Sequence, residues 1–162
     1  MRLSRGNVAY IYVAIILAII LSSIILTRKS EPLEINCKAF VKVNIDLGHI
    51  QVAFSIIKYL ELYGNGQGII LFEGDVISGD SKSYLERTVY LSHGVKIDDN
   101  NYNFIIDKIV RSPLDTTLDK DFYQMWLENT GDNKLFPVRV KKIRENAYLI
   151  SSPYSPQFIC IE

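Results

Sequence analysis

The residue types that most often carry catalysis are scarce and poorly spaced in this chain. Only two histidines occur, His49 and His93, and no Gly-x-Ser-x-Gly nucleophile motif accompanies them. His49 follows a glycine at a break between two strand-like stretches and His93 precedes a glycine, so both are expected to be turn residues. The sequence therefore predicts a protein that is not an enzyme and that needs no cofactor.

Metal and phosphate motifs are also incomplete. The run Asp98–Asn103 begins with the spacing of a calcium loop, but Phe104 and Val110 stand where that loop requires glycine and a bidentate glutamate. The glycines of residues 64–68 resemble a phosphate loop only in composition, because no lysine or helix start follows them. We expect two solvated turns here and no metal site.

The two cysteines could form a disulfide. Cys37 lies at the start of the predicted outer domain and Cys160 close to its end. A bridge between them would close a loop of more than a hundred residues, which the chain-entropy view values at about 4 to 5 kcal/mol at most. It would also require the first and last strands to be neighbours. Two buried free thiols are the alternative.

Apolar side chains are more abundant than a small sheet needs. Residues 50–63 and 102–110 read as strands with apolar groups on both faces, whereas an antiparallel sheet normally buries one face. A helix, a partner or an apolar ligand must cover the second face. The candidate pocket or interface comprises Phe54, Ile56, Phe72, Leu91, Phe104, Ile106 and Trp126.

Two polar residues share a predicted apolar face with the candidate pocket. Strict alternation over residues 83–97 places Arg87 and His93 on the face that also carries Leu85, Val89, Leu91, Val95 and Ile97. There they could orient an anionic amphipathic ligand. Internal pairing with Glu73 or Asp75 is an equally plausible role.

The elements that would position these residues are mostly strands. Alternating or apolar stretches bounded by turn residues occur at 35–47, 50–63, 69–77, 83–97, 102–110, 135–143, 147–151 and 157–161. Residues 118–129 have helical spacing of Leu118, Phe122, Met125 and Trp126, with Asp119 as a cap. We therefore expect a mainly β (β-rich α+β) antiparallel meander or barrel with one short helix. Closure within one chain or with a partner stays open.

The stretch Val8–Leu26 predicts a single membrane span. Its 19 residues contain no charge, proline or glycine, and as a helix they would cover about 28 Å of the ~30 Å hydrocarbon core. A cleaved signal peptide is the alternative, but no small-residue cleavage site follows the run. Ala14, Ala18 and Ser22 form a small-residue stripe that either packs against another helix or simply reflects composition.

The span divides the chain into a tail at 1–7, a helix at 8–26, a linker at 27–34 and a β-rich domain at 35–162. Basic residues flank both ends of the span, so their number does not indicate the orientation. The short tail and the location of both cysteines favour a cytoplasmic N-terminus. Beyond residue 30 the chain carries 14 basic and 18 acidic residues, a formal charge of −4. This balance argues against nucleic acid as a partner.

Several motifs together resemble the FidL-like single-pass inner-membrane proteins, which are similar in arrangement to ToxS and VtrC type accessory proteins. They are the basic tail and span, Cys-x-x-Phe at 37–40, GIILFEGDV at 68–76, LERTVY at 85–90, Asp115 after Ser-Pro-Leu, and SSPYSPQFIC at 151–160. The resemblance implies a bacterial inner-membrane protein with a periplasmic domain. It carries over no catalytic residues.

The resemblance also implies a partner. Members of such families work with a bitopic regulator of the ToxR/CadC-like kind, which has a cytoplasmic winged-helix domain and an exported sensor domain. We therefore expect an accessory protein that forms a barrel-like heterodimer with that sensor domain and modulates its signalling, with a shared pocket for bile salts or lipidic signals. A stand-alone periplasmic lipid or bile-acid binding barrel is the alternative.

Overall fold

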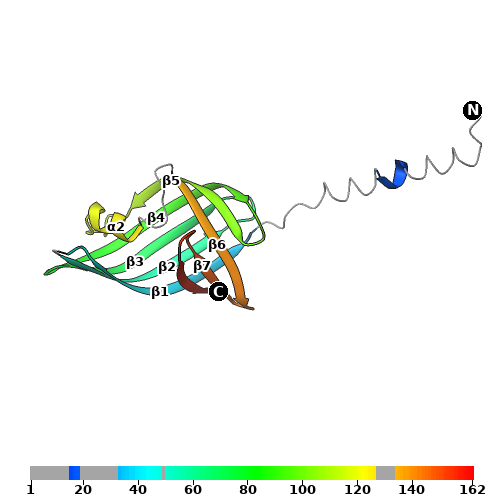
Figure 1. The fold of residues 1–162 in the computed structure, drawn as a ribbon. Coiled ribbons are helices and arrows are strands. Elements are labelled where there is room, and N and C mark those ends of the chain that lie inside the picture. Colours follow the sequence, from blue (N-terminus) through cyan, green and yellow to red (C-terminus); the bar gives the residue numbers. More distant parts are fainter. Residues whose placement is uncertain (1–14, 19–32, 49, 127–133) are drawn as a thin grey trace, which may run out of the picture. The chain divides into compact units, whose positions relative to one another are not determined.

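The computed structural model describes residues 15–18, 33–48, 50–126 and 134–162 of the 162-residue chain. The chain divides into two compact units, residues 1–31 and 32–162. In the first unit, residues 15–18 are helical and exposed. The second unit is a β-barrel with one described helix, which confirms the mainly β fold (Figure 1).

The described residues form eight strands that follow one another around a closed antiparallel barrel (Figure 1). Their order in the barrel is their order in the sequence, so the predicted meander closes within a single chain. The strands are β1 (Ile35–Asp46), β2 (Gln51–Leu62), β3 (Gly68–Ser78), β4 (Ser81–Lys96), β5 (Asn101–Arg111), β6 (Leu135–Arg144), β7 (Ala147–Ser151) and β8 (Pro156–Ile161).

The alternation of side chains explains the barrel. In β2 every second residue from Val52 to Leu62 is buried, and the residues between them are half-buried. An eight-stranded barrel has an interior just wide enough for inward side chains to fill it. The inward faces of all eight strands therefore merge into one hydrophobic core.

Strand β1 is fully paired on one side and hardly paired on the other. Its ladder with β2 runs without a bulge from Ile35 to Asp46, whereas its ladder with β8 consists, over the described chain, of Lys38 opposite Ile161. We call residues 39–46 of β1, beyond this pair, the free edge. The strands β7 and β8 are also much shorter than β1 to β5.

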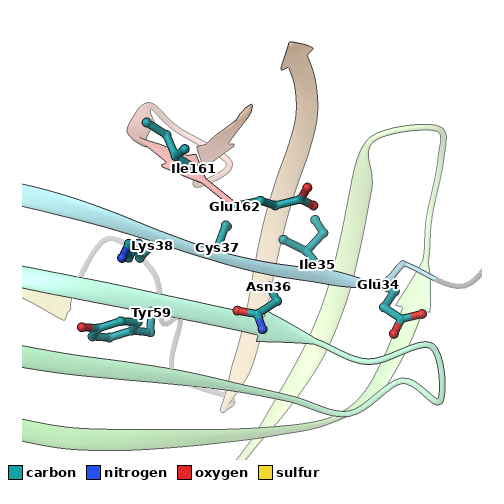
Figure 2. Close-up of a pocket in the computed structure, with 8 residues that line it drawn as sticks. All are labelled: Glu34, Ile35, Asn36, Cys37, Lys38, Tyr59, Ile161 and Glu162. Atoms are coloured by element: carbon teal, nitrogen blue, oxygen red, sulfur yellow. The ribbon is translucent and has the colours of Figure 1, made fainter. Parts of the chain in front are cut away.

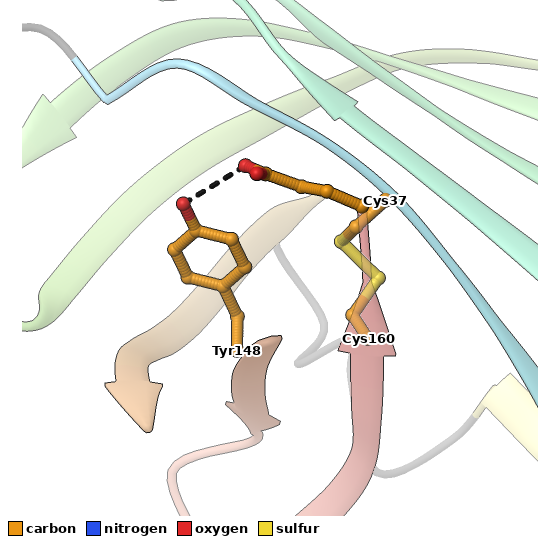
Figure 3. Close-up of a disulfide and its surroundings, with 4 residues drawn as sticks. Cys37, Tyr148 and Cys160 are labelled. Carbon is orange, nitrogen blue, oxygen red and sulfur yellow. Dashed lines mark hydrogen bonds between the residues drawn. A yellow bond between two sulfur atoms is a disulfide. The ribbon is translucent and has the colours of Figure 1, made fainter. Parts of the chain in front are cut away.

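A disulfide closes the seam between β1 and β8. Cys37 and Cys160 are bonded, as predicted, with Cα atoms 5.4 Å apart and a sequence separation of 123 positions. Beside the bridge, the Tyr148 hydroxyl donates a hydrogen bond of 2.9 Å to the Glu162 carboxylate (Figure 3). Burial and this hydrogen bond raise the pKa of Tyr148. The bridge therefore ties the first strand to the last where the backbone ladder is shortest.

The predicted helix is present as α2 (Asp119–Trp126), at the end of the barrel that the short strands do not reach (Figure 1). Phe122, Met125 and Trp126 are buried, and the Phe122 ring packs edge-on against Phe72 with centroids 5.6 Å apart. The expectation that Leu118 belongs to this buried face is wrong, because it precedes the helix and is 57% exposed. The predicted residues 127–129 lie outside the described part of the chain.

A bulge in β4 overturns the predicted face of its last residues. The register of β4 with β5 shifts between Ser92 and Val95, and His93 adopts a positive φ of 52°. The following Gly94 lies so close to the Phe104 ring that a Cβ atom could not fit. Val95 and Ile97 consequently face solvent, not the core as strict alternation predicted.

The membrane-span prediction lies almost wholly outside the described residues, as do Ala14 and Ser22 of the small-residue stripe. Ala18 is described, and it is helical and exposed. Among the described residues, no helix has the length and apolar character needed to cross a membrane.

We predict that replacing both cysteines by alanine opens the seam. The free energy of unfolding should fall by about 2 to 5 kcal/mol, because the unfolded chain regains the freedom of a long loop. Urea unfolding of the full-length protein in neutral detergent measures the loss. Amide hydrogen exchange should accelerate in β8 and leave the β2–β3 ladder protected. Uniform acceleration in all strands would contradict a local role for the bridge.

Candidate functional site

One row of inward-facing residues crosses four neighbouring strands near the seam. The strand registers place Ala39, Lys58, Phe72 and Arg87 side by side on β1 to β4, and all four are buried. This row brings two cations into the core, one on each side of Phe72. A buried cation requires a compensating partner, so the surroundings of each decide what it does.

Arg87 is fully engaged by the chain that leads into α2. Its Nε lies 2.8 Å from Asp115 Oδ2, its Nη1 lies 2.8 Å from Asp119 Oδ1, and its Nη2 donates to the Thr117 carbonyl at 2.7 Å. Its guanidinium also lies over the Phe122 ring, 4.7 Å from the centroid. Arg87 thus holds α2 against the barrel, and each of its three guanidinium nitrogens has a partner in the chain.

Asp115 is the centre of this arrangement. Its side chain is fully buried, and besides Arg87 it accepts hydrogen bonds from the backbone amides of Glu86 and Thr117 at 3.1 and 2.8 Å. With Arg111 Nε at 3.4 Å from Asp115 Oδ1, four hydrogen bonds or ion-pair contacts to one carboxylate compensate the loss of hydration. Arg111 adds two hydrogen bonds to the Asp115 carbonyl. The predicted internal pairing of Arg87 is therefore present, but with Asp115 and Asp119 instead of Glu73 or Asp75.

Lys58 is the other inward cation, and its environment is the opposite. It is 5% exposed, and its Nζ lies over the rings of Phe72 and Phe158 at 5.4 and 5.0 Å from their centroids. The ion pairs found in the described chain leave Lys58 without a carboxylate. Burial lowers the pKa of Lys58 from 10.5 to about 8. At neutral pH it remains mostly a cation, compensated by aromatic faces alone.

Trp126 carries a buried donor close to Phe72. Trp126 Nε1 is buried and has no hydrogen-bond partner among the described residues. Trp126 stacks on Phe136 and packs edge-on against Phe72, which fixes its ring. A cavity of about 20 Å³ touches both Lys58 and Trp126. Its other lining residues are Leu60, Ile70, Phe72, Phe136, Val138, Ile150, Ser151, Gln157 and Phe158.

The seven predicted pocket or interface residues all lie in the hydrophobic core, not on an exposed interface. Phe54, Ile56, Phe72, Leu91, Phe104, Ile106 and Trp126 are each no more than 7% exposed. Phe72 and Trp126 alone among them line the small cavity. The reason is that the strands close into a barrel. Their inward apolar faces then pack against one another or against α2.

His93 does not accompany Arg87, so the prediction that the two share a face is wrong. The bulge turns His93 outward, where it is exposed and where its Nδ1 lies 2.8 Å from the Ser92 hydroxyl. Arg87 points inward from the same strand. The two residues consequently cannot orient one ligand together.

The free edge of β1 is the largest departure from complete pairing. Its inward residues Val41, Val43 and Ile45 are half-buried and pack against the core. On the outward face Phe40 is 66% exposed, with Lys42 Nζ 5.9 Å from its ring centroid. An edge with unpaired backbone groups and apolar side chains is a template for another strand.

A shallow groove adjoins this edge on the disulfide side. Figure 2 shows its lining residues on β1, β2 and the end of β8. The groove measures about 550 Å³ and is lined by Glu34, Ile35, Asn36, Cys37, Lys38, Tyr59, Ile161 and Glu162. Its mixed charges and open form suit contact with a protein surface better than enclosure of a small molecule.

Sequence reasoning missed the roles of two residues and of one strand edge. Lys58 is inward by simple alternation with Ile56 and Leu60, a signal that the apolar surroundings concealed. Asp115 lies in a non-periodic segment, where no pattern indicates burial. The free edge has no signal in β1 itself, because it depends on how far β8 pairs with β1.

The comparisons with known proteins agree with the chain's resemblance. The model of a family described as "FidL-like putative membrane protein" matches residues 74–160, from the middle of β3 to the disulfide cysteine of β8. No curated protein matches the sequence.

We predict that Arg87→Met lowers the free energy of unfolding by about 3 kcal/mol, because the buried Asp115 carboxylate would keep only the more distant and half-exposed Arg111 as a cation, at 3.4 Å. Asp119→Ala is the matched control, since the Asp119 side chain is 69% exposed and its pairing should contribute less than about 1 kcal/mol. Urea unfolding of both variants measures the difference. Equal losses would contradict the central place of Asp115.

We predict that Lys58→Met changes how stability depends on pH. The unfolded chain holds this proton up to pH 10.5 and the folded chain only to about 8. Between these values the unfolded state binds more protons, so wild-type stability should rise with pH by up to about 3 kcal/mol. The variant should lack this rise and be more stable at pH 7.

The control for this experiment is Lys141→Met, which removes an exposed lysine from β6. Urea unfolding at pH 7, 8, 9 and 10 compares the three proteins. A pH profile of Lys58→Met that coincides with the wild-type profile would contradict the assignment of the buried amine.

Proposed function

The chain belongs to the FidL-like family of membrane proteins, and from this membership we propose that it is a membrane-anchored accessory protein of a transcriptional regulator. Its barrel, on the outer side of the bacterial inner membrane, would pair with the exported sensor domain of a bitopic winged-helix regulator and modulate its signalling. The role is binding rather than catalysis. The free edge of β1 is the observation that carries this proposal.

The edge offers a complete strand face to a partner. An unbroken ladder with β2 holds residues 39–46 in an extended conformation. Their backbone N–H and C=O groups on the side away from β2 are therefore already arranged for strand addition. Val41, Val43 and Ile45 would become fully buried when a strand covers them. Each buried methylene contributes roughly 0.8 kcal/mol, so three half-exposed side chains are a substantial part of a binding energy.

The charges of the edge favour a different chain over a second copy. Lys42 lies beside Phe40 on the outward face of the edge, and antiparallel pairing of two copies centred on this residue would set the two Lys42 side chains opposite each other. A partner strand with acidic outward residues would instead be attracted. The occupant that fits is thus an extended, acidic strand of another exported domain.

A stand-alone lipid or bile-acid binder is less well supported. Pockets for molecules of that size measure several hundred Å³, and the interior cavity measures about 20 Å³. Any pocket for such a ligand would therefore require the seam to open or a partner to contribute walls. This consideration favours pairing as the primary role.

We predict that the chain co-purifies with a bitopic winged-helix regulator of the same organism, both as full-length proteins in neutral detergent. Phe40→Glu combined with Lys42→Glu should weaken the complex at least about tenfold, because it removes the apolar contact and repels an acidic strand. Lys141→Glu on β6 is the matched control and should leave the affinity unchanged.

Hydrogen exchange supplies the decisive readout. Amides of the free edge that face away from β2 should exchange rapidly in the isolated chain and slowly in the complex. Separate purification of the two proteins, or a complex that leaves residues 39–46 unprotected, would overturn the proposal.

A further inference from the structure

Two residues with hydrogen-bond donors, Lys58 and Trp126, lie close together in the core. Lys58 and Trp126 line the same cavity; Trp126 Nε1 is buried without a hydrogen-bond partner, and the ion pairs of the described chain include none with Lys58. Buried donors left unpaired are costly, and native proteins keep few of them. The contrast with Arg87, which lies in the same cross-strand row and has two carboxylate partners, makes the absence more telling.

We propose that this cavity receives the carboxylate of an alkanoate, a small molecule with one carboxylate and an apolar tail. One oxygen would accept from the Lys58 ammonium and from the indole N–H of Trp126. A volume of about 20 Å³ admits a group the size of one water molecule, which suits the end of a chain and not a whole ligand.

The cavity also indicates where the tail would leave. Gln157 and Phe158 of β8 line the cavity and are half-buried, so its wall reaches the surface along that strand. Ala39, the neighbour of Lys58 on β1, lies just beyond the last β1–β8 ladder pair. The tail would therefore run along the seam, where the strands are held by the disulfide and not by a continuous ladder.

The lining favours an alkanoate over an inorganic anion. Apart from Lys58, Trp126, Ser151 and Gln157, the residues around the cavity are aliphatic or phenyl side chains. Phosphate would bring a second charge and a larger hydration shell into this apolar wall. A single carboxylate satisfies both donors and keeps its remaining surface apolar.

The chain provides its own probe, because Trp126 is its only tryptophan. The full-length protein in neutral detergent is titrated with hexanoate, and the single indole ¹H–¹⁵N resonance is followed. Hexanoate should move this resonance downfield along a saturable curve, as expected when an N–H gains a charged acceptor. Hexanol and phosphate, which lack either the charge or the tail, should have no such effect.

Variants separate this site from nonspecific uptake. Lys58→Met should abolish the hexanoate response or raise its midpoint at least tenfold, and Lys141→Met should respond as the wild type does. A resonance indifferent to hexanoate, as for a site that holds water alone, overturns the proposal. Equal shifts with hexanol, or a full response in Lys58→Met, overturn it too. Because no regulator is present, these outcomes are independent of the pairing experiment.

Discussion

The covalent bond between Cys37 and Cys160 is the constraint on which the barrel depends, because the backbone joins its first and last strands at a single ladder pair. Seven of the eight strand junctions are antiparallel ladders between strands that follow one another in the sequence, so their closure costs less loop entropy than that of the eighth. The eighth must bring together residues 123 positions apart. A disulfide resolves this problem in an oxidising compartment, and it allows β8 to be short.

The short β8 has two consequences that bear on function. On the outer side, residues 39–46 of β1 have no ladder partner in β8, although β1 also contacts α2, and closed barrels normally abolish such an edge. On the inner side the short β8 leaves the end of the barrel to α2, whose aromatic residues complete the core. The same feature thus creates a surface for strand addition and a helix that must be held in place.

Arg87 and Lys58 show how one row of the barrel uses buried charge in two ways. Arg87 fixes α2 through Asp115 and Asp119, and its compensation is complete. Lys58, on the seam side of Phe72, is compensated only by aromatic faces. A fully paired buried ion is structural, whereas a buried cation without a carboxylate is the kind of group that binding sites retain. The indole N–H of Trp126, which is buried without a hydrogen-bond partner in the described chain, independently indicates a binding site on the side of Lys58.

The sequence by itself determined the strands, the short helix, the cysteine pair and membership of a membrane-protein family, because each depends on local periodicity, spacing or motif. Period-two alternation and turn residues located all eight strands, and helical spacing located α2. Tertiary structure decided what depends on relations between distant segments. It closed the barrel within one chain, turned His93 outward at a bulge, chose Asp115 as the partner of Arg87, and left Lys58 unpaired. Local patterns state which face a side chain takes, but not which distant group will meet it there.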